Sequence, residues 1–124
     1  MILKRLKEAT GARHGALESR LPLLDADMSR ARYRRFLLRF WGYYAPLEAQ
    51  LLALPYWNSM DFDYAGRHKT PRLVQDLRAL GEPPGSIEGF ARCQHLPKLA
   101  SLGQLLGCLY VIEGATLGGQ VATP

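Results

Sequence analysis

The sequence predicts an all-α fold, organised as a single domain over residues 1–124. Apolar residues recur at intervals of three or four, and no segment alternates apolar and polar residues as a half-buried strand would. Clusters of proline and glycine separate the periodic segments. With 48% apolar and 22% charged residues, the chain has a globular composition, and its length suits one core.

The first two predicted helices occupy the first 52 residues. We expect one helix over residues 3–19, ended by Leu21 and Pro22. The next follows Ser29, a good N-cap residue, and carries aromatic and leucine side chains at helical spacing as far as Leu51. Because proline lacks an N–H group, Pro46 should kink or divide this helix.

The middle of the chain contains more turn signals. Residues 55–69 are expected to form an irregular connection with one helical turn. A third helix should start at Thr70 as N-cap, with Pro71 at its first position, and end at Gly81. We also expect a short fourth helix over residues 86–94.

The last predicted helix begins near Ser101 and contains an unusual number of glycines. Glycine destabilises a helix interior by about 0.5–1 kcal/mol relative to alanine, so its repeated use needs a reason. At helical periodicity four glycines fall within a stripe roughly 60° wide: Gly103, Gly107, Gly114 and Gly118. Such a face leaves the main chain open to close contact, either with another helix or with a ligand.

The same helix has two further interpretations. Its only charge is Glu113 and its small residues lie four apart, as in membrane helices. Polar residues interrupt the segment and no basic cluster closely flanks it, so a buried helix without membrane contact is favoured.

The N-terminus lacks the apolar core of a secretion signal, and Cys93 and Cys108 match no metal or disulfide pattern. These two features predict a cytoplasmic location.

A net charge of +5 favours an anionic partner. Five arginines crowd the start of the second helix: Arg30, Arg32, Arg34, Arg35 and Arg39. They could bind nucleic acid or an acidic protein such as a ferredoxin. Arginine-rich helical faces are commonly just solvated, and no helix-turn-helix spacing is present, so we do not expect nucleic-acid binding.

Three histidines are candidates for chemistry. We expect His68 and His95 to be solvated loop residues, whereas His14 shares a helical face with Lys7 and Glu18. In one interpretation His14 is an ordinary surface histidine paired with Glu18. In the other it is an axial ligand, because one imidazole suffices for haem, and Glu18 accepts a hydrogen bond from its second nitrogen.

Two segments together resemble the haem oxygenase family. Residues 6–10 (LKEAT), followed by His14, look like the proximal helix of that family, and residues 109–120 (LYVIEGATLGGQ) are similar to its distal helix. Residues 32–33 and 43–48 resemble the bacterial branch found alongside bacteriophytochromes.

The resemblance implies a helical bundle that holds haem between the first and distal helices. Members oxidise haem to biliverdin, releasing CO and iron, with O2 and with electrons from ferredoxin or a reductase. By the match, His14 would be the proximal iron ligand, Glu18 its hydrogen-bond partner, and Lys7 the partner of a propionate.

The resemblance also assigns the distal side. Gly114, Gly118 and Gly119 would bring main chain close to the oxygen-binding side of the iron, and Tyr110 would contact the haem. The animal enzymes have aspartate where this chain has Ala115. Either the distal water is held differently, as the bacterial branch allows, or the protein is a catalytically weak or inactive haem binder.

The family has further helices beyond the distal one. The resemblance therefore implies a bundle that is truncated after the distal helix and incomplete at the C-terminus. An uncovered core would favour a homodimer or exchange of the last helix between copies.

Overall fold

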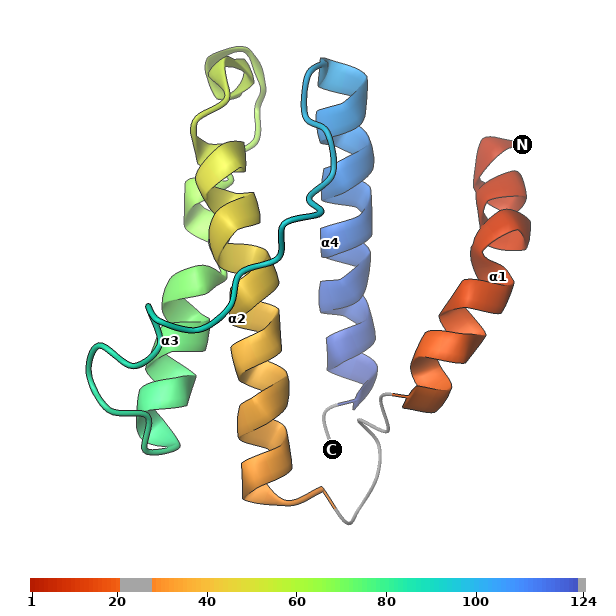
Figure 1. Ribbon diagram of the computed structural model, residues 1–124. Helices are drawn as coiled ribbons and strands as arrows, with labels where there is room; N and C mark the ends of the chain where they lie inside the picture. Colours follow the sequence, from red (N-terminus) through yellow and green to blue (C-terminus); the bar gives the residue numbers. More distant parts are fainter. Residues whose placement is uncertain (21–27, 123–124) are drawn as a thin grey trace.

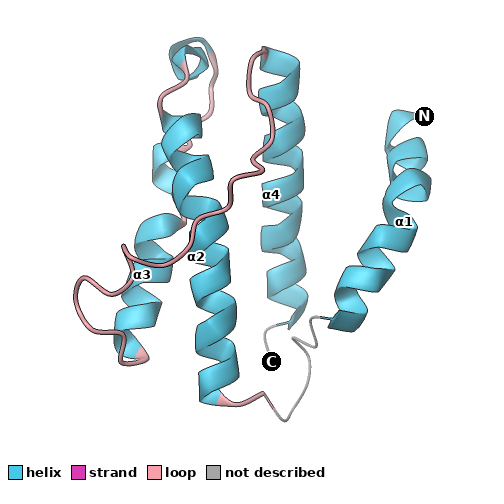
Figure 2. Ribbon diagram, in the orientation of Figure 1, coloured by secondary structure: helices cyan, strands magenta, loops and turns pink. Residues whose placement is uncertain are grey.

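A computed structural model describes residues 1–20 and 28–122, with the main chain alone for 116–122. The described residues form helices and connections without strands, which confirms the all-α prediction (Figures 1 and 2). The four α-helices are α1 (Ile2–Arg20), α2 (Arg30–Leu52), α3 (Thr70–Ala79) and α4 (Leu102–Ala122). Two short 3-10 helices, η1 (Pro55–Ser59) and η2 (Ala65–Arg67), occupy the connection between α2 and α3.

Helix α2 begins as predicted, since the side chain of Ser29 caps it by accepting the N–H of Arg32 at 3.1 Å. Pro46 does not divide the helix, contrary to one expectation. Proline removes the hydrogen bond to the carbonyl four residues earlier, which belongs to Gly42. That carbonyl instead accepts the N–H of Cys93 at 2.8 Å, so a distant segment replaces the missing donor.

Helix α3 ends where the glycine predicted. Gly81 has a φ of 98°, and the N–H of Glu82 bonds to the carbonyl of Leu77 at 3.0 Å, the paired-turn ending that favours glycine. Its start differs from the prediction, because Lys69 and not Thr70 is the capping residue. Lys69 contributes no side-chain cap; the carboxylate of Glu48 accepts the first N–H groups instead.

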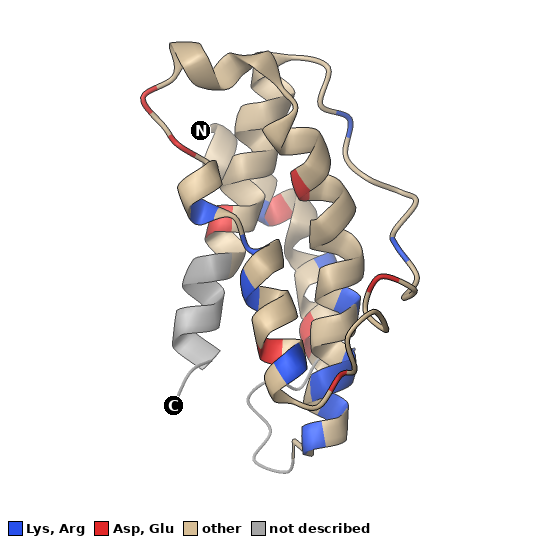
Figure 3. Cartoon of the chain, turned by 90° about the vertical axis from the view of Figure 1, so that its left-hand side faces the viewer, with Lys and Arg blue, Asp and Glu red and all other residues tan. Residues whose placement is uncertain are grey.

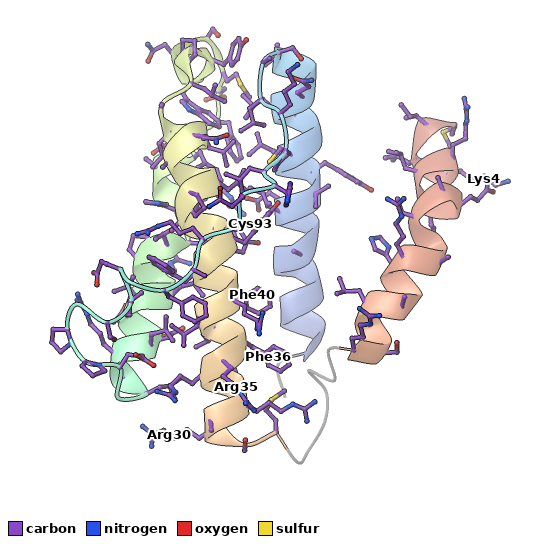
Figure 4. The ribbon with its side chains drawn as sticks, viewed as in Figure 1. Lys4, Arg30, Arg35, Phe36, Phe40 and Cys93 are labelled. Atoms are coloured by element: carbon purple, nitrogen blue, oxygen red, sulfur yellow. The ribbon has the colours of Figure 1, made fainter. Side chains whose placement is uncertain are left out.

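The helix expected over residues 86–94 is wrong. This segment forms turns and then extended chain that crosses α2, where Figure 4 labels Cys93. Its Ile87 side chain is 2% exposed, and a Cβ built on Gly42 would lie 2.5 Å from the carbonyl oxygen of Ala91. Packing against the bare main chain of α2 therefore decides the conformation of this segment.

The core consists of two clusters that share α2. One joins the first half of α2 to α3 and the crossing segment, through Leu37, Trp41, Leu77 and Ile87. The other joins the second half of α2 to α4 and the aromatic connection, with these fully buried members: Leu47, Leu51, Tyr64, Leu105 and Ile112. Helix α1 contributes no buried side chain and stands apart from the other helices (Figure 1).

Candidate functional site

Helix α4 has a buried face and an open face. Leu105, Cys108, Leu109 and Ile112 are buried, and at 100° per residue the glycine stripe lies on the opposite side. A Cβ added at Gly107 or Gly114 would meet no atom within 4 Å. Among the described residues, therefore, no atom of another element lies against these two glycines.

The open face of α4 is apolar as well as bare. Tyr110 and Val111, which flank the glycines, are 60% and 63% exposed. Helix α4 is therefore apolar on opposite sides, which is typical of a helix covered on both. Gly114 lies on this face beside Tyr110, while Gly118 and Gly119 lie in the last turns, where only the main chain is described.

Helix α1 carries the other predicted site residues. Lys7, His14 and Glu18 are all exposed, and no hydrogen bond or ion pair joins His14 to Glu18 in the described part of the chain. The face next to them carries exposed Leu3, Leu6 and Leu17. The structure thus leaves His14 accessible but does not bring it into contact with α4.

The exposed apolar surface is concentrated on these two helices. Only Tyr33 and Leu52, among the exposed large hydrophobic residues of the described chain, lie elsewhere than on α1, on α4 or at the N-terminal Met1. Exposed apolar patches on a small protein commonly mark binding sites. Both helices therefore carry a face suited to an apolar ligand.

A cavity of about 470 Å³ adjoins the open face of α4. Gly107, Val111, Tyr43 and His95 are among its lining residues. Burial, followed by the nearby thiols of Cys108 and Cys93, raises the pKa of the Tyr43 phenol, which keeps it protonated. His95 is exposed as expected, but its position at a cavity was not apparent from the sequence.

The most buried charge of the described chain is a feature that sequence reasoning missed. Glu48 is 0% exposed and accepts hydrogen bonds from the Tyr64 hydroxyl at 2.5 Å and from the N–H groups of Lys69 and Thr70 at 2.9 and 2.7 Å. Burial, and then the hydrogen bond to Glu48, raise the pKa of Tyr64. A glutamate within the apolar stripe of α2 was the available signal.

His68 belongs to the same cluster, so the expectation of a solvated loop histidine is wrong. Its side chain is 28% exposed, and its Nε2 lies 3.4 Å from Oε1 of Glu48. The reason is a contact with another helix, because the Glu48 carboxylate of α2 accepts the main-chain N–H groups of Lys69 and Thr70, the two residues after His68. The cluster thereby attaches the start of α3 to the middle of α2.

Glu113, the only charge of α4, is paired with cations from the connection before α3. Arg67 donates two hydrogen bonds to its carboxylate, one of them 2.8 Å long, and Nζ of Lys69 lies 3.8 Å away. The hydrogen bond from Arg67 lowers the pKa of Glu113. The sequence identified this charge but not its partners.

The arginine-rich end of α2 is partly occupied by contacts within the protein. Arg34 pairs with Glu82 at 2.7 Å, and Arg30 donates to the carbonyl of Ala79 at the end of α3 at 3.3 Å. Figure 4 labels Arg30 and Arg35 on this end, and Figure 3 shows basic residues gathered there. These contacts give two of the five arginines a role in joining α2 to α3.

The described residues lack the features of two other kinds of site. They contain no helix with both the length and the apolar character needed to cross a membrane. Nor do they bring three histidine, cysteine, aspartate or glutamate side chains together as ligands for a metal ion. Haem requires no such group, since the porphyrin supplies four ligands.

Comparison with known proteins agrees with the helical geometry. No curated protein and no solved structure matches the chain. A family model described as "Heme oxygenase" matches residues 1–122, which is nearly the whole sequence. The chain therefore belongs to the heme oxygenase family.

Proposed function

We propose that this protein binds haem between α1 and α4 and oxidises it to biliverdin, releasing CO and iron. The family match supports haem as the ligand. The observation that carries the proposal is the open glycine face of α4, directly opposite its buried face. A flat macrocycle can lie against such a face where a side chain would hold it away.

The residues of α1 fit the other side of the ligand. His14 is exposed and has no partner among the described residues, so its imidazole is available as axial ligand. Glu18, one helical turn further on, would accept the hydrogen bond that orients the ring. Lys7 lies two turns before His14, roughly 10 Å along the axis, where it would meet a propionate.

The distal side would act through its lack of side chains. Bound haem supplies the iron at which O2 reacts, while the protein orients the macrocycle and controls its surroundings. At Gly114, Gly118 and Gly119 the main chain would lie close to the iron, leaving room for ordered water. Tyr110 would cover the edge of the ring with its exposed aromatic side chain.

A second function is binding of haem without turnover. Ala115 follows the first distal glycine, and its side chain offers no hydrogen-bonding group to hold water. In this version His14 and the glycine face still bind haem, but its oxidation is slow or absent.

Haemin titration followed by reduction under air tests both versions. We expect a sharp Soret band for the parent and its loss or shift in His14→Ala, while His95→Ala tests the other exposed histidine, which lies at the cavity beside α4. With ascorbate or reduced ferredoxin, biliverdin absorbance and CO release indicate the enzyme, and a stable oxygenated spectrum indicates the binder. An unchanged Soret band in His14→Ala contradicts the ligand assignment.

The proposed reaction also requires an electron donor. The exposed arginines Arg35 and Arg39 at the start of α2 suit an acidic ferredoxin or reductase. We place the reaction in the cytoplasm and the protein near the bacterial branch of the family. The protein forms a homodimer if the open faces of α1 and α4 meet those of a second copy. Light scattering with and without haemin checks the dimer.

A further inference from the structure

A continuous series of polar contacts runs from α2 to α4. The buried carboxylate of Glu48 on α2 holds the main chain of Lys69 and Thr70 and the hydroxyl of Tyr64. Between these anchored points lies Arg67, whose guanidinium pairs with Glu113 of α4. The segment of residues 64–70 therefore connects a fully buried anchor on one helix to the only charge on another.

Apolar packing by itself does not specify how α4 is rotated about its axis. Its exposed side also carries large apolar side chains, such as Leu106, Tyr110 and Val111, so a rotated helix would still bury apolar surface. A planar guanidinium paired with a carboxylate has a defined geometry, which a rotation would break. Glu113 lies between the two faces, where such a constraint acts most directly on rotation.

The pair also follows the last buried side chain among the described side chains of α4, which end at Ala115. That residue is Ile112, directly before Glu113. Gly114 and Ala115, the next two residues, are exposed. Glu113 is thus the last described side chain of α4 held by another element, directly before the glycine proposed to face haem.

We infer that the Arg67–Glu113 ion pair is a positioning device that sets the rotation of α4 and thereby directs Gly114 toward the haem. The inference rests on the proposed function, because it assigns a role to this pair in the same site. The pair is exposed to solvent, so it contributes little to stability, and its effect should appear in ligand geometry.

Haemin binding by paired variants tests the inference, with Arg34→Gln as control. Arg34 and Arg67 are similarly exposed, at 41% and 47%, and each pairs with one glutamate, but Arg34 lies on the α2–α3 side. We expect Arg67→Gln and Glu113→Gln each to weaken haemin binding about five- to tenfold and to broaden the Soret band. Arg67→Lys, which keeps the charge, should recover part of the affinity.

The double variant Arg67→Gln/Glu113→Gln should bind no more weakly than either single variant, because the two residues act together. Thermal unfolding of the haem-free proteins should show equal stability for Arg67→Gln and Arg34→Gln. Parental haemin affinity and an unchanged Soret band in Arg67→Gln would overturn the inference while leaving the proposed function intact. A parent that does not bind haemin would overturn both, and equal weakening by Arg34→Gln would show a general charge effect.

Discussion

The α2–α3 side of the protein and the open face of α4 both contain glycines, but they differ in what lies against the glycine main chain. On the α2–α3 side, Gly42 lets a crossing segment approach and its carbonyl receives the N–H of Cys93. On α4, Gly107 and Gly114 also lack a side chain, but no atom of the described residues from another element lies against them. Glycine therefore serves internal packing in one region, and in the other it lies on an open surface where we propose that haem binds.

Loss of the buried Glu48 carboxylate on the α2–α3 side should have the largest effect on stability. Glu48→Ala would leave the Tyr64 hydroxyl and two main-chain N–H groups without their acceptor. We expect a loss of about 3–5 kcal/mol in the free energy of unfolding. Urea denaturation measures it, with exposed Glu88→Ala as control. A loss below that of the control would mean that water replaces the carboxylate.

A side chain on the open glycine face should affect binding and not folding. Gly114→Leu places a bulky group where the haem is proposed to lie, and we expect at least about a hundredfold weaker haemin binding, or about 2.7 kcal/mol. Because the position is open, the haem-free variant should unfold at the parental temperature or above it. Parental haemin affinity would show that the glycines do not face the ligand.

A side chain added at Gly42, on the α2–α3 side, should affect folding and not binding. A Cβ at Gly42 would lie 2.5 Å from the main-chain oxygen of Ala91, which must move away and weaken the bond from Cys93. We expect Gly42→Ala to lower the free energy of unfolding by about 1–3 kcal/mol. Haemin affinity of the folded variant should stay within about twofold of the parent. Unchanged stability would show that the crossing segment is loosely held.

The smallest effect concerns pH. The hydrogen bond from Arg67 lowers the pKa of Glu113 in the folded protein, so its stabilisation is present above the ordinary glutamate range and is lost as pH falls below about 4. The difference in unfolding temperature between the parent and Glu113→Gln should therefore shrink as pH falls from 6 to 3. A constant difference would mean that the carboxylate charge contributes nothing there.

Several elements were predictable because their signals are local. Ser29 caps α2 and Gly81 ends α3 as expected, since a hydroxyl at an N-cap and a left-handed residue after a helix act on their immediate neighbours. The prediction of a helix over 86–94 failed because the competing contact comes from Gly42, more than forty residues away. The environment of His68 was missed for the same reason, as Glu48 lies on another helix.

In the candidate site, too, local features were predictable and contacts between distant segments were not. Periodicity alone placed His14 with Lys7 and Glu18 on one face, and aligned the glycines on another, because residues three and four apart must share a helical face. Only the tertiary structure decided that, among the described residues, the glycine face of α4 is left open and that Arg67 pairs with Glu113. A helix that is apolar all round carries no local signal for the side that it buries, so its neighbours make that choice.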